Sequence, residues 1–188
     1  LKVLEKAYSS NSSAFIPIYG RRRVGKSELI LHFIEDKTSV YFLGKRANQE
    51  LQIREFLRES SIALDIPLLR RFSTSDWESA LSAVFESWNN DKKLIMVFDE
   101  FQWTVESCPE LISVIQKLWD RKWKDNRKIF LIICGSYIGF MEREVLGRKS
   151  PLFGRRTGQI FLKPFCYKDA AEFHPDYSLV DRARTYFI

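Results

Sequence analysis

FIPIYGRRRVGKSELI, residues 15–30, contains a short apolar run, a glycine-rich loop and the start of an amphipathic segment in immediate succession. The run FIPIY stops at Gly20 and is typical of a buried strand. From Leu29 to Ile34 the apolar residues are dense enough for a helix packed on a sheet. Between them, GRRRVGKS matches G-x-x-x-x-G-K-[ST], the Walker A pattern, which predicts a loop that cradles phosphate groups.

Each fixed position of this loop has a physical role. The glycines let backbone N–H groups turn toward phosphate oxygens without a Cβ in the way. The helix that begins at Lys26 directs its positive end at the same phosphates, and Lys26 adds a point charge. The Ser27 hydroxyl is expected to coordinate Mg²⁺. The alternative, a glycine-rich turn with a surface lysine, does not explain the flanking strand and helix. The residues predicted to bind the nucleotide are Gly20, Arg21, Arg22, Arg23, Val24, Gly25, Lys26, Ser27 and Glu28.

Three consecutive arginines, Arg21 to Arg23, lie inside this loop. Because the backbone forms the cradle, their side chains are not required for it. Our hypothesis is that they lie at the mouth of the site and that at least one contacts phosphate or a neighbouring subunit.

LIMVFDE, residues 94–100, is the second part of the predicted site. The apolar run is expected to bring Asp99 to the carboxyl end of a buried strand, where open α/β sheets bind their ligands. Asp99 is predicted to hold Mg²⁺ as a Walker B acid, and Glu100 to polarise the attacking water as a general base. Taken alone, such an acidic pair could equally cap a helix. Together with the phosphate loop, and without an N-K-x-D base-reading motif, it favours hydrolysis of ATP over GTP hydrolysis or phosphoryl transfer to another substrate.

Two further segments offer candidate catalytic residues. Ser136, after the apolar run IFLII at 129–133, could sense the terminal phosphate, or it could simply cap the helix expected near Ile138. Arg155 and Arg156, in GRRTG at 154–158, are candidates for an arginine that stabilises the developing charge. Arg155 is preferred, and a solvated loop or a polyanion contact is the alternative.

Apolar runs at 39–43, 94–98, 129–133 and 159–162 predict further strands. Amphipathic segments between them predict helices over about 50–64, after a capping box of Ser75 and Glu78, and after a second one of Ser107 and Glu110. Apolar strands alternating with helices indicate an α/β fold with a parallel sheet covered on both faces. We expect one domain over residues 1–188, with a final helical stretch from Tyr167.

The net charge of +6 reflects basic clusters at 21–23, 120–128 and 147–158. These clusters suit nucleic acid or another polyanion, with solvated surface as the alternative. No apolar run approaches the length of a membrane span, and the first residues have no signal-peptide pattern. Three widely spaced cysteines favour reduced thiols and a cytoplasmic protein over a disulfide or zinc framework.

The segments YGRRRVGKSELI, FDEFQW, CGSYIGFM and SPLFGRRTGQIFLKPF occur in this order, and together they resemble the archaeal-type ATPase family, a branch of the AAA+/STAND-like P-loop ATPases also found in bacteria. The resemblance implies a three-layer ASCE core with a sheet of about five strands in the order 5-1-4-3-2, and Mg²⁺–ATP as ligand. It also implies Glu100 as the catalytic carboxylate, Ser136 at the sensor-1 position, and Arg155 and Arg156 in a basic loop typical of the family.

Family members usually continue into a helical lid, and often into a domain resembling restriction nucleases. We therefore expect the chain to be part of a longer protein, without its N-terminal start, its lid and any C-terminal effector domain. The function that the sequence favours is Mg²⁺-dependent ATP hydrolysis that drives or switches a larger assembly, which could be a homo-oligomer. The alternative is a nucleic-acid-binding module gated by nucleotide, with little hydrolysis of its own.

Overall fold

Five segments of the chain form one parallel sheet in the computed structural model, which describes residues 1–187. The strands are β1 (Ala14–Tyr19), β2 (Ser39–Leu43), β3 (Leu94–Asp99), β4 (Ile129–Gly135) and β5 (Ile160–Phe161). Their order across the sheet is β2-β3-β4-β1-β5, and every pairing is parallel. From the other edge this is the order 5-1-4-3-2, so the predicted α/β fold is confirmed. Ile188, part of the predicted single domain, lies outside the described residues.

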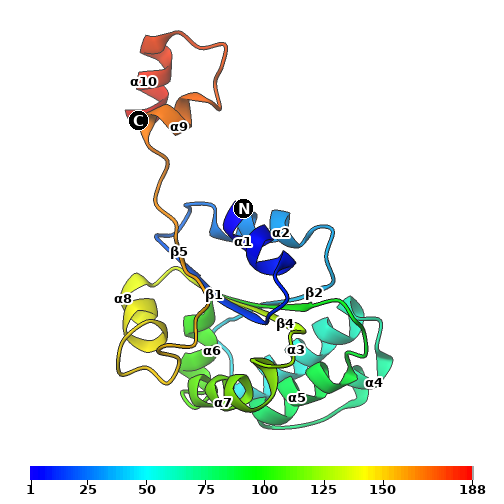
Figure 1. Ribbon diagram of the computed structural model, residues 1–188. Coiled ribbons are helices and arrows are strands. Elements are labelled where there is room, and N and C mark those ends of the chain that lie inside the picture. Colours follow the sequence, from blue (N-terminus) through cyan, green and yellow to red (C-terminus); the bar gives the residue numbers. More distant parts are fainter. Residues whose placement is uncertain (188) are drawn as a thin grey trace.

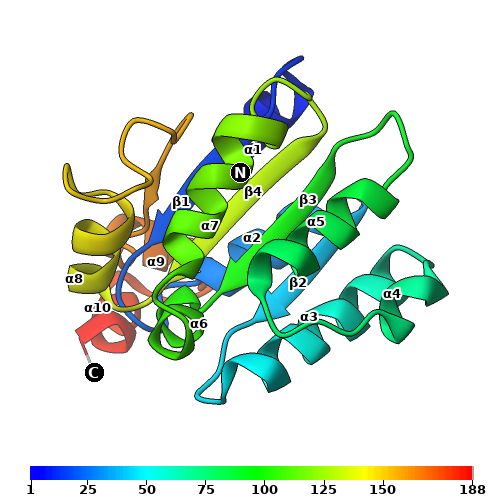
Figure 2. The same ribbon diagram turned by 90° about the horizontal axis from the view of Figure 1, so that it is seen from below.

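Helices cover both faces of the sheet (Figure 1). One face carries α1 (Lys2–Ser9) and α2 (Lys26–Ile34), and the other carries α3 (Gln49–Ala63), α5 (Trp77–Ser87), α6 (Phe101–Ser107) and α7 (Leu111–Leu118). Shorter elements are α4 (Pro67–Arg71), α8 (Ile138–Phe140) and the π-helical turns η1 (Trp119–Trp123) and η2 (Met141–Val145). Seen from below, α3 and α4 lie beside the β2 edge (Figure 2). The helical stretch expected from Tyr167 consists of α9 (Tyr167–Ala171) and α10 (Leu179–Phe187), which stand apart from the sheet.

The three central strands β1, β3 and β4 are buried along their whole length, as their unbroken apolar sequences predict. Alternate side chains of β1 enter different cores. Ile16 and Ile18 pack with α2, whereas Phe15 and Tyr19 belong to the core under α3, α5 and α7. Within residues 1–187, no helix combines the length and the apolar character needed to span a membrane.

Four aromatic rings pack together between β2, β3 and the helices α3 and α5. Phe42, Phe56, Trp77 and Phe98 come from β2, α3, α5 and β3, and all six pairs have ring centroids between 5.4 and 5.9 Å apart. Each ring is essentially inaccessible to solvent. Aromatic pairs at these distances stabilise beyond the burial of area alone. The cluster therefore fixes the strand that ends in Asp99.

Both predicted capping boxes were wrong in detail. The α5 helix is capped by Asp76, whose Oδ1 accepts a hydrogen bond from the Ser79 amide at 2.7 Å, and not by Ser75. Ser107 does not start a helix but ends α6, where its hydroxyl donates to the Thr104 carbonyl at 2.9 Å. Aspartate accepts such a bond as well as serine does, and the Ser107 hydroxyl is already engaged by the preceding turn.

The first helix, α1, was not predicted and depends on a contact distant in sequence. The ammonium of Lys93, just before β3, donates to the carbonyls of Ala7, Tyr8 and Ser10 at 3.1, 2.8 and 2.5 Å. Only 9% of Lys93 is exposed, and burial lowers its pKa. These carbonyls are among those that a helix end leaves without partners, so Lys93 caps α1 from another part of the chain.

Replacing Lys93 tests this cap. Lys93→Met keeps an unbranched side chain but removes all three charged hydrogen bonds, so we expect the free energy of unfolding to fall by about 2–3 kcal/mol. Amide hydrogen exchange should also accelerate in α1. Denaturation by urea and exchange measurements would check both, with the exposed neighbour changed in Lys92→Met as the matched control. Equal effects of the two substitutions would show that Lys93 has no capping role.

Candidate functional site

The glycine-rich loop joins the carboxyl end of β1 to α2, and two glycines are required by its geometry. A Cβ added at Gly20 would lie 2.1 Å from the carbonyl oxygen of Leu162, which no side chain could tolerate. Gly25 precedes α2 with φ of 85°, in the left-handed region that glycine occupies at no steric cost. The backbone therefore turns at the N-terminus of α2, where helix N–H groups are available to an anion.

Lys26 is buried, and its ammonium donates to the Arg21 carbonyl at 2.8 Å, so its side chain folds over the loop. Val24 is half-buried, and Glu28 is exposed at the start of α2. Arg21 to Arg23 are exposed, and in residues 1–187 their side chains form no hydrogen bond or ion pair. They are thus available to a ligand, and a contact with phosphate or a neighbouring subunit stays a prediction.

The Asp99 carboxylate accepts several hydrogen bonds at the centre of the site. Its Oδ2 accepts hydrogen bonds from the Ser27 hydroxyl at 2.6 Å and the Tyr41 hydroxyl at 2.5 Å, and Oδ1 accepts one from the Glu100 amide at 2.8 Å. Burial acts to raise the pKa of Asp99, but hydrogen bonds from Cys134, Ser27, Tyr41 and the Glu100 amide together hold it below its ordinary value. Asp99 is therefore a carboxylate at neutral pH.

Tyr41 and Cys134 were not among the predicted site residues. Burial, followed by the proximity of Asp99, raises the pKa of each, so both remain protonated and act as donors to the carboxylate. They come from β2 and β4, the two strands that flank β3. Only the order and register of the strands bring them to Asp99, and no local pattern in the sequence would reveal it.

Glu100 follows Asp99 in a left-handed backbone conformation, with φ of 49° and ψ of 43°. Its carboxylate accepts two hydrogen bonds, both at Oε2. One comes from the Ser136 hydroxyl at 2.9 Å and the other from the side-chain amide of Gln102. Glu100 and Ser136, which were predicted separately as catalytic residues, are therefore in direct contact, and Gln102 is a third member that the sequence did not indicate.

Gln102 is 5% exposed, and its Oε1 is a buried atom without a hydrogen-bond partner in the described residues. Gly135 lies against it, since a Cβ at that position would be 3.0 Å from the same oxygen. The end of β4 therefore leaves just enough room for the Gln102 amide to reach Glu100.

The structure does not bring Arg155 to Lys26 and Asp99. Its guanidinium forms a two-pronged ion pair with Asp120, with Nη2 2.6 Å from Oδ2 and Nε 2.9 Å from Oδ1. The Thr157 amide bonds the Phe15 carbonyl, which places this loop at the start of β1, at the opposite end from the glycine-rich loop. Arg156 donates to the Leu146 carbonyl at 3.2 Å. A catalytic role for Arg155 remains a prediction, and it would have to act on a neighbouring molecule.

The arrangement suits a phosphorylated ligand with a divalent cation. Backbone N–H groups and Lys26 supply positive charge, while the Ser27 hydroxyl and Asp99 carboxylate supply adjacent oxygen donors. Oxygen donors, a carboxylate among them, are the ligands that Mg²⁺ takes in proteins. The residues present therefore fit this ion.

Comparison with known proteins gives related sequences and structures. The chain is 35% identical over 175 residues to the uncharacterized protein MJECL04 of Methanocaldococcus jannaschii, covering 93% of this chain but 37% of that protein. Among solved structures, the Walker-type ATPase PABY2304 of Pyrococcus abyssi has a TM-score of 0.65 at 22% identity, covering 92% of this chain and 54% of that one. Drosophila ORC bound to DNA has a TM-score of 0.66 at 10% identity, covering 92% and 44%.

The two structural likenesses concern the fold alone, and the chain spans less than half of the M. jannaschii protein. The family comparison covers nearly the whole sequence: the model of an ATPase domain found predominantly in Archaea matches residues 1–181. This chain therefore belongs to that family of P-loop ATPase domains.

Proposed function

We propose that this domain hydrolyses ATP with Mg²⁺ and serves as the motor or switch of a longer protein. The observation that carries the proposal is the contact chain across the ends of three strands. Ser27 bonds Asp99, Glu100 follows directly, and Ser136 bonds Glu100. Two carboxylates, each bonded by a different serine hydroxyl, support two separate roles, one in holding a metal ion and one in activating water.

Nucleotide binding would use the loop and Lys26. The ammonium of Lys26 would exchange the Arg21 carbonyl for phosphate oxygens, which are stronger acceptors because they are charged. Ser27 and Asp99 would hold Mg²⁺ between them. When bound, this ion supplies positive charge that neutralises the phosphates and stabilises charge on the transferred group.

Glu100 is proposed to act on water. Ser136 and Gln102 both bond its Oε2, which fixes the side chain and leaves Oε1 to accept a proton from a water molecule. Ser136 would also orient that water toward the terminal phosphate. Asp99 is less suited to this role, because hydrogen bonds from Cys134, Ser27, Tyr41 and the Glu100 amide hold its pKa below the ordinary value and so make it a weak proton acceptor.

The preference for ATP is supported by the absence of an N-K-x-D motif from the sequence. A role within a longer protein is supported by the M. jannaschii relative, of which this chain spans 37%. The alternative, a nucleotide-gated module that binds nucleic acid with little hydrolysis, draws on the net charge of +6 and on Drosophila ORC, whose structure contains DNA. Turnover by the wild-type chain separates the two.

Lys26→Ala tests the nucleotide site. The variant should lose binding of Mg²⁺–ATP, because no other buried cation lies in the loop, and calorimetric titration would measure it. Wild-type chain should bind Mg²⁺–ATP more tightly than Mg²⁺–GTP. Lys92→Ala, at an exposed position before β3, is the control and should bind like wild type. Unchanged affinity in Lys26→Ala would refute the assignment.

Glu100→Gln separates binding from hydrolysis. The amide keeps the size of the side chain but cannot accept a proton, so we expect turnover to fall by about 10²–10⁴-fold while ATP affinity is retained. Steady-state phosphate release and calorimetry would measure the two quantities. Glu35→Gln, exposed just after α2, should change neither. If Glu100→Gln hydrolysed ATP at the wild-type rate, Glu100 would not be the base.

A further inference from the structure

Trp103, in the first turn of α6, has no role in the nucleotide site described above. Its side chain is half-buried, and the Arg46 guanidinium lies 4.2 Å from the centre of its ring. Arg46 belongs to the loop between β2 and α3. This stacked pair stands three residues along the chain from Glu100, at the mouth of the candidate site.

Three hollows follow one another here, each sharing at least one lining residue with the next. The first, about 570 Å³, is lined by Arg22, Lys45 and Glu100 together with Arg46 and Trp103. The second, also about 570 Å³, shares Arg46 and Trp103 and reaches Asn48. The third, about 780 Å³, shares Asn48 and extends between α3 and residues 72–75. We call these three hollows together the α3 groove.

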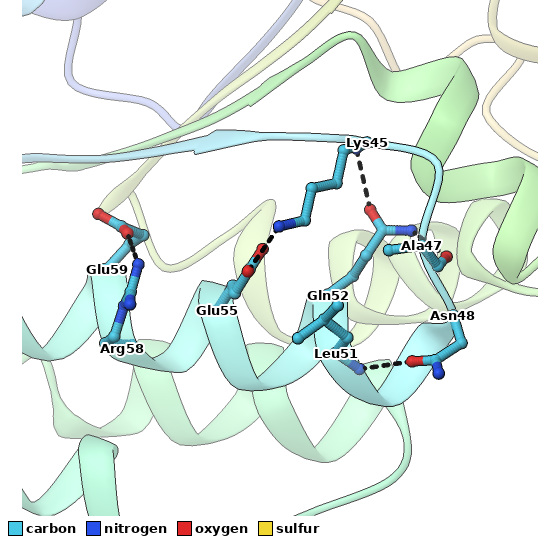
Figure 3. Close-up of polar contacts among 8 residues, drawn as sticks. All are labelled: Lys45, Ala47, Asn48, Leu51, Gln52, Glu55, Arg58 and Glu59. Atoms are coloured by element: carbon cyan, nitrogen blue, oxygen red, sulfur yellow. Dashed lines mark hydrogen bonds and ion pairs between the residues drawn. The ribbon is translucent and has the colours of Figure 1, made fainter.

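The charges along the α3 groove are mostly positive. Its lining includes Glu50, Glu100 and Glu106 but twice as many basic side chains, namely Arg22, Lys45, Arg46, Arg54, Arg70 and Arg71. Lys45 is paired with Glu55 at 2.6 Å, as Figure 3 shows. Arg54, Arg70 and Arg71 are exposed and form no ion pair within residues 1–187. They converge from α3 and α4 on the third hollow.

Some basic side chains of the other clusters are neutralised by ion pairs. In the clusters at 120–128 and 147–158, Arg155 pairs with Asp120, Lys122 with Glu86, and Lys128 with Asp91. On α3 itself, one turn beyond Arg54, Arg58 pairs with Glu59 at 2.9 Å and lines none of the three hollows (Figure 3). The α3 groove thus combines unpaired arginines with an aromatic ring on a concave surface.

We propose that the α3 groove binds single-stranded nucleic acid. Guanidinium groups match the geometry of phosphates, and Arg54, Arg70 and Arg71 would follow the backbone. An aromatic ring with a stacked guanidinium offers a flat face to an unpaired base, as in many single-strand-binding proteins. A duplex hides its base faces and would use only the arginines.

The α3 groove ends at Glu100, so an occupied groove brings a strand against the proposed catalytic carboxylate. Such contact would connect strand binding with the nucleotide site. This connection rests on the proposed function, whereas strand binding does not.

The first experiment measures affinity in the absence of ATP. Fluorescence anisotropy would follow binding of an oligothymidine of about 15 nucleotides to the 188-residue chain over a range of salt concentrations. For single strands, each lost phosphate contact reduces the slope of log K against log salt by about 0.7. The triple variant Arg54→Ala, Arg70→Ala, Arg71→Ala should therefore lose about 2 from the slope, and the Arg58→Ala control should lose nothing.

The second experiment tests the base platform. Trp103→Ala should weaken oligothymidine binding roughly tenfold with little change in salt slope, because it removes stacking and no charge. Trp103→Phe should retain most of the affinity, which excludes misfolding as the cause. A duplex of equal length and a polyphosphate should bind more weakly and respond to the arginine variants but not to Trp103→Ala.

Three results would overturn the inference: no binding at low salt, an equal loss in Arg58→Ala, or duplex and polyphosphate binding as tightly as the single strand. Lys26→Ala should bind the strand normally, since it affects only the nucleotide site. A chain that hydrolyses ATP but binds no strand would remove this inference and leave the proposed function intact.

Discussion

The structure depends on one constraint at its centre, a carboxylate buried at the end of β3. Asp99 and Ser27 are 72 residues apart in the sequence. Their 2.6 Å hydrogen bond joins the start of α2, which follows β1, to β3, which lies two strands from β1 in the sheet. A buried charge is costly unless hydrogen bonds compensate for it. Here the donors come from α2, β2, β4 and the next residue of the chain. The strand order brings these donors together, and the aromatic cluster of Phe42, Phe56, Trp77 and Phe98 holds β3 in place between them.

Much of this centre could be predicted because it is encoded locally. The glycine-rich loop and the pair Asp99–Glu100 are contiguous motifs, and the strands are unbroken apolar runs. Tyr41, Cys134 and Gln102 could not be found in this way, since their roles arise from strand register and from the space beside Gly135. The α1 helix escaped prediction for a similar reason, because its cap is supplied by a lysine more than 80 residues away.

Charge clusters show a further limit of sequence. Arginines look alike in a sequence, yet their surroundings differ greatly. Arg155 is held by Asp120, whereas Arg21 to Arg23 are unpaired within the phosphate loop. Since ion pairing depends on tertiary contacts, a basic stretch reveals its excess charge but not how much of that charge remains available to a partner.

The backbone at Glu100 has a consequence for stability. A residue with a side chain in the left-handed region costs about 1–2 kcal/mol relative to the ordinary helical conformation. Glycine would adopt the same φ of 49° without that cost, but it would leave Ser136 and Gln102 without their acceptor. Leaving the buried Gln102 amide unpaired would itself cost about 1–3 kcal/mol, which offsets the relief of backbone strain. The hydrogen bonds of the Glu100 carboxylate therefore compensate for the backbone conformation that its own side chain disfavours.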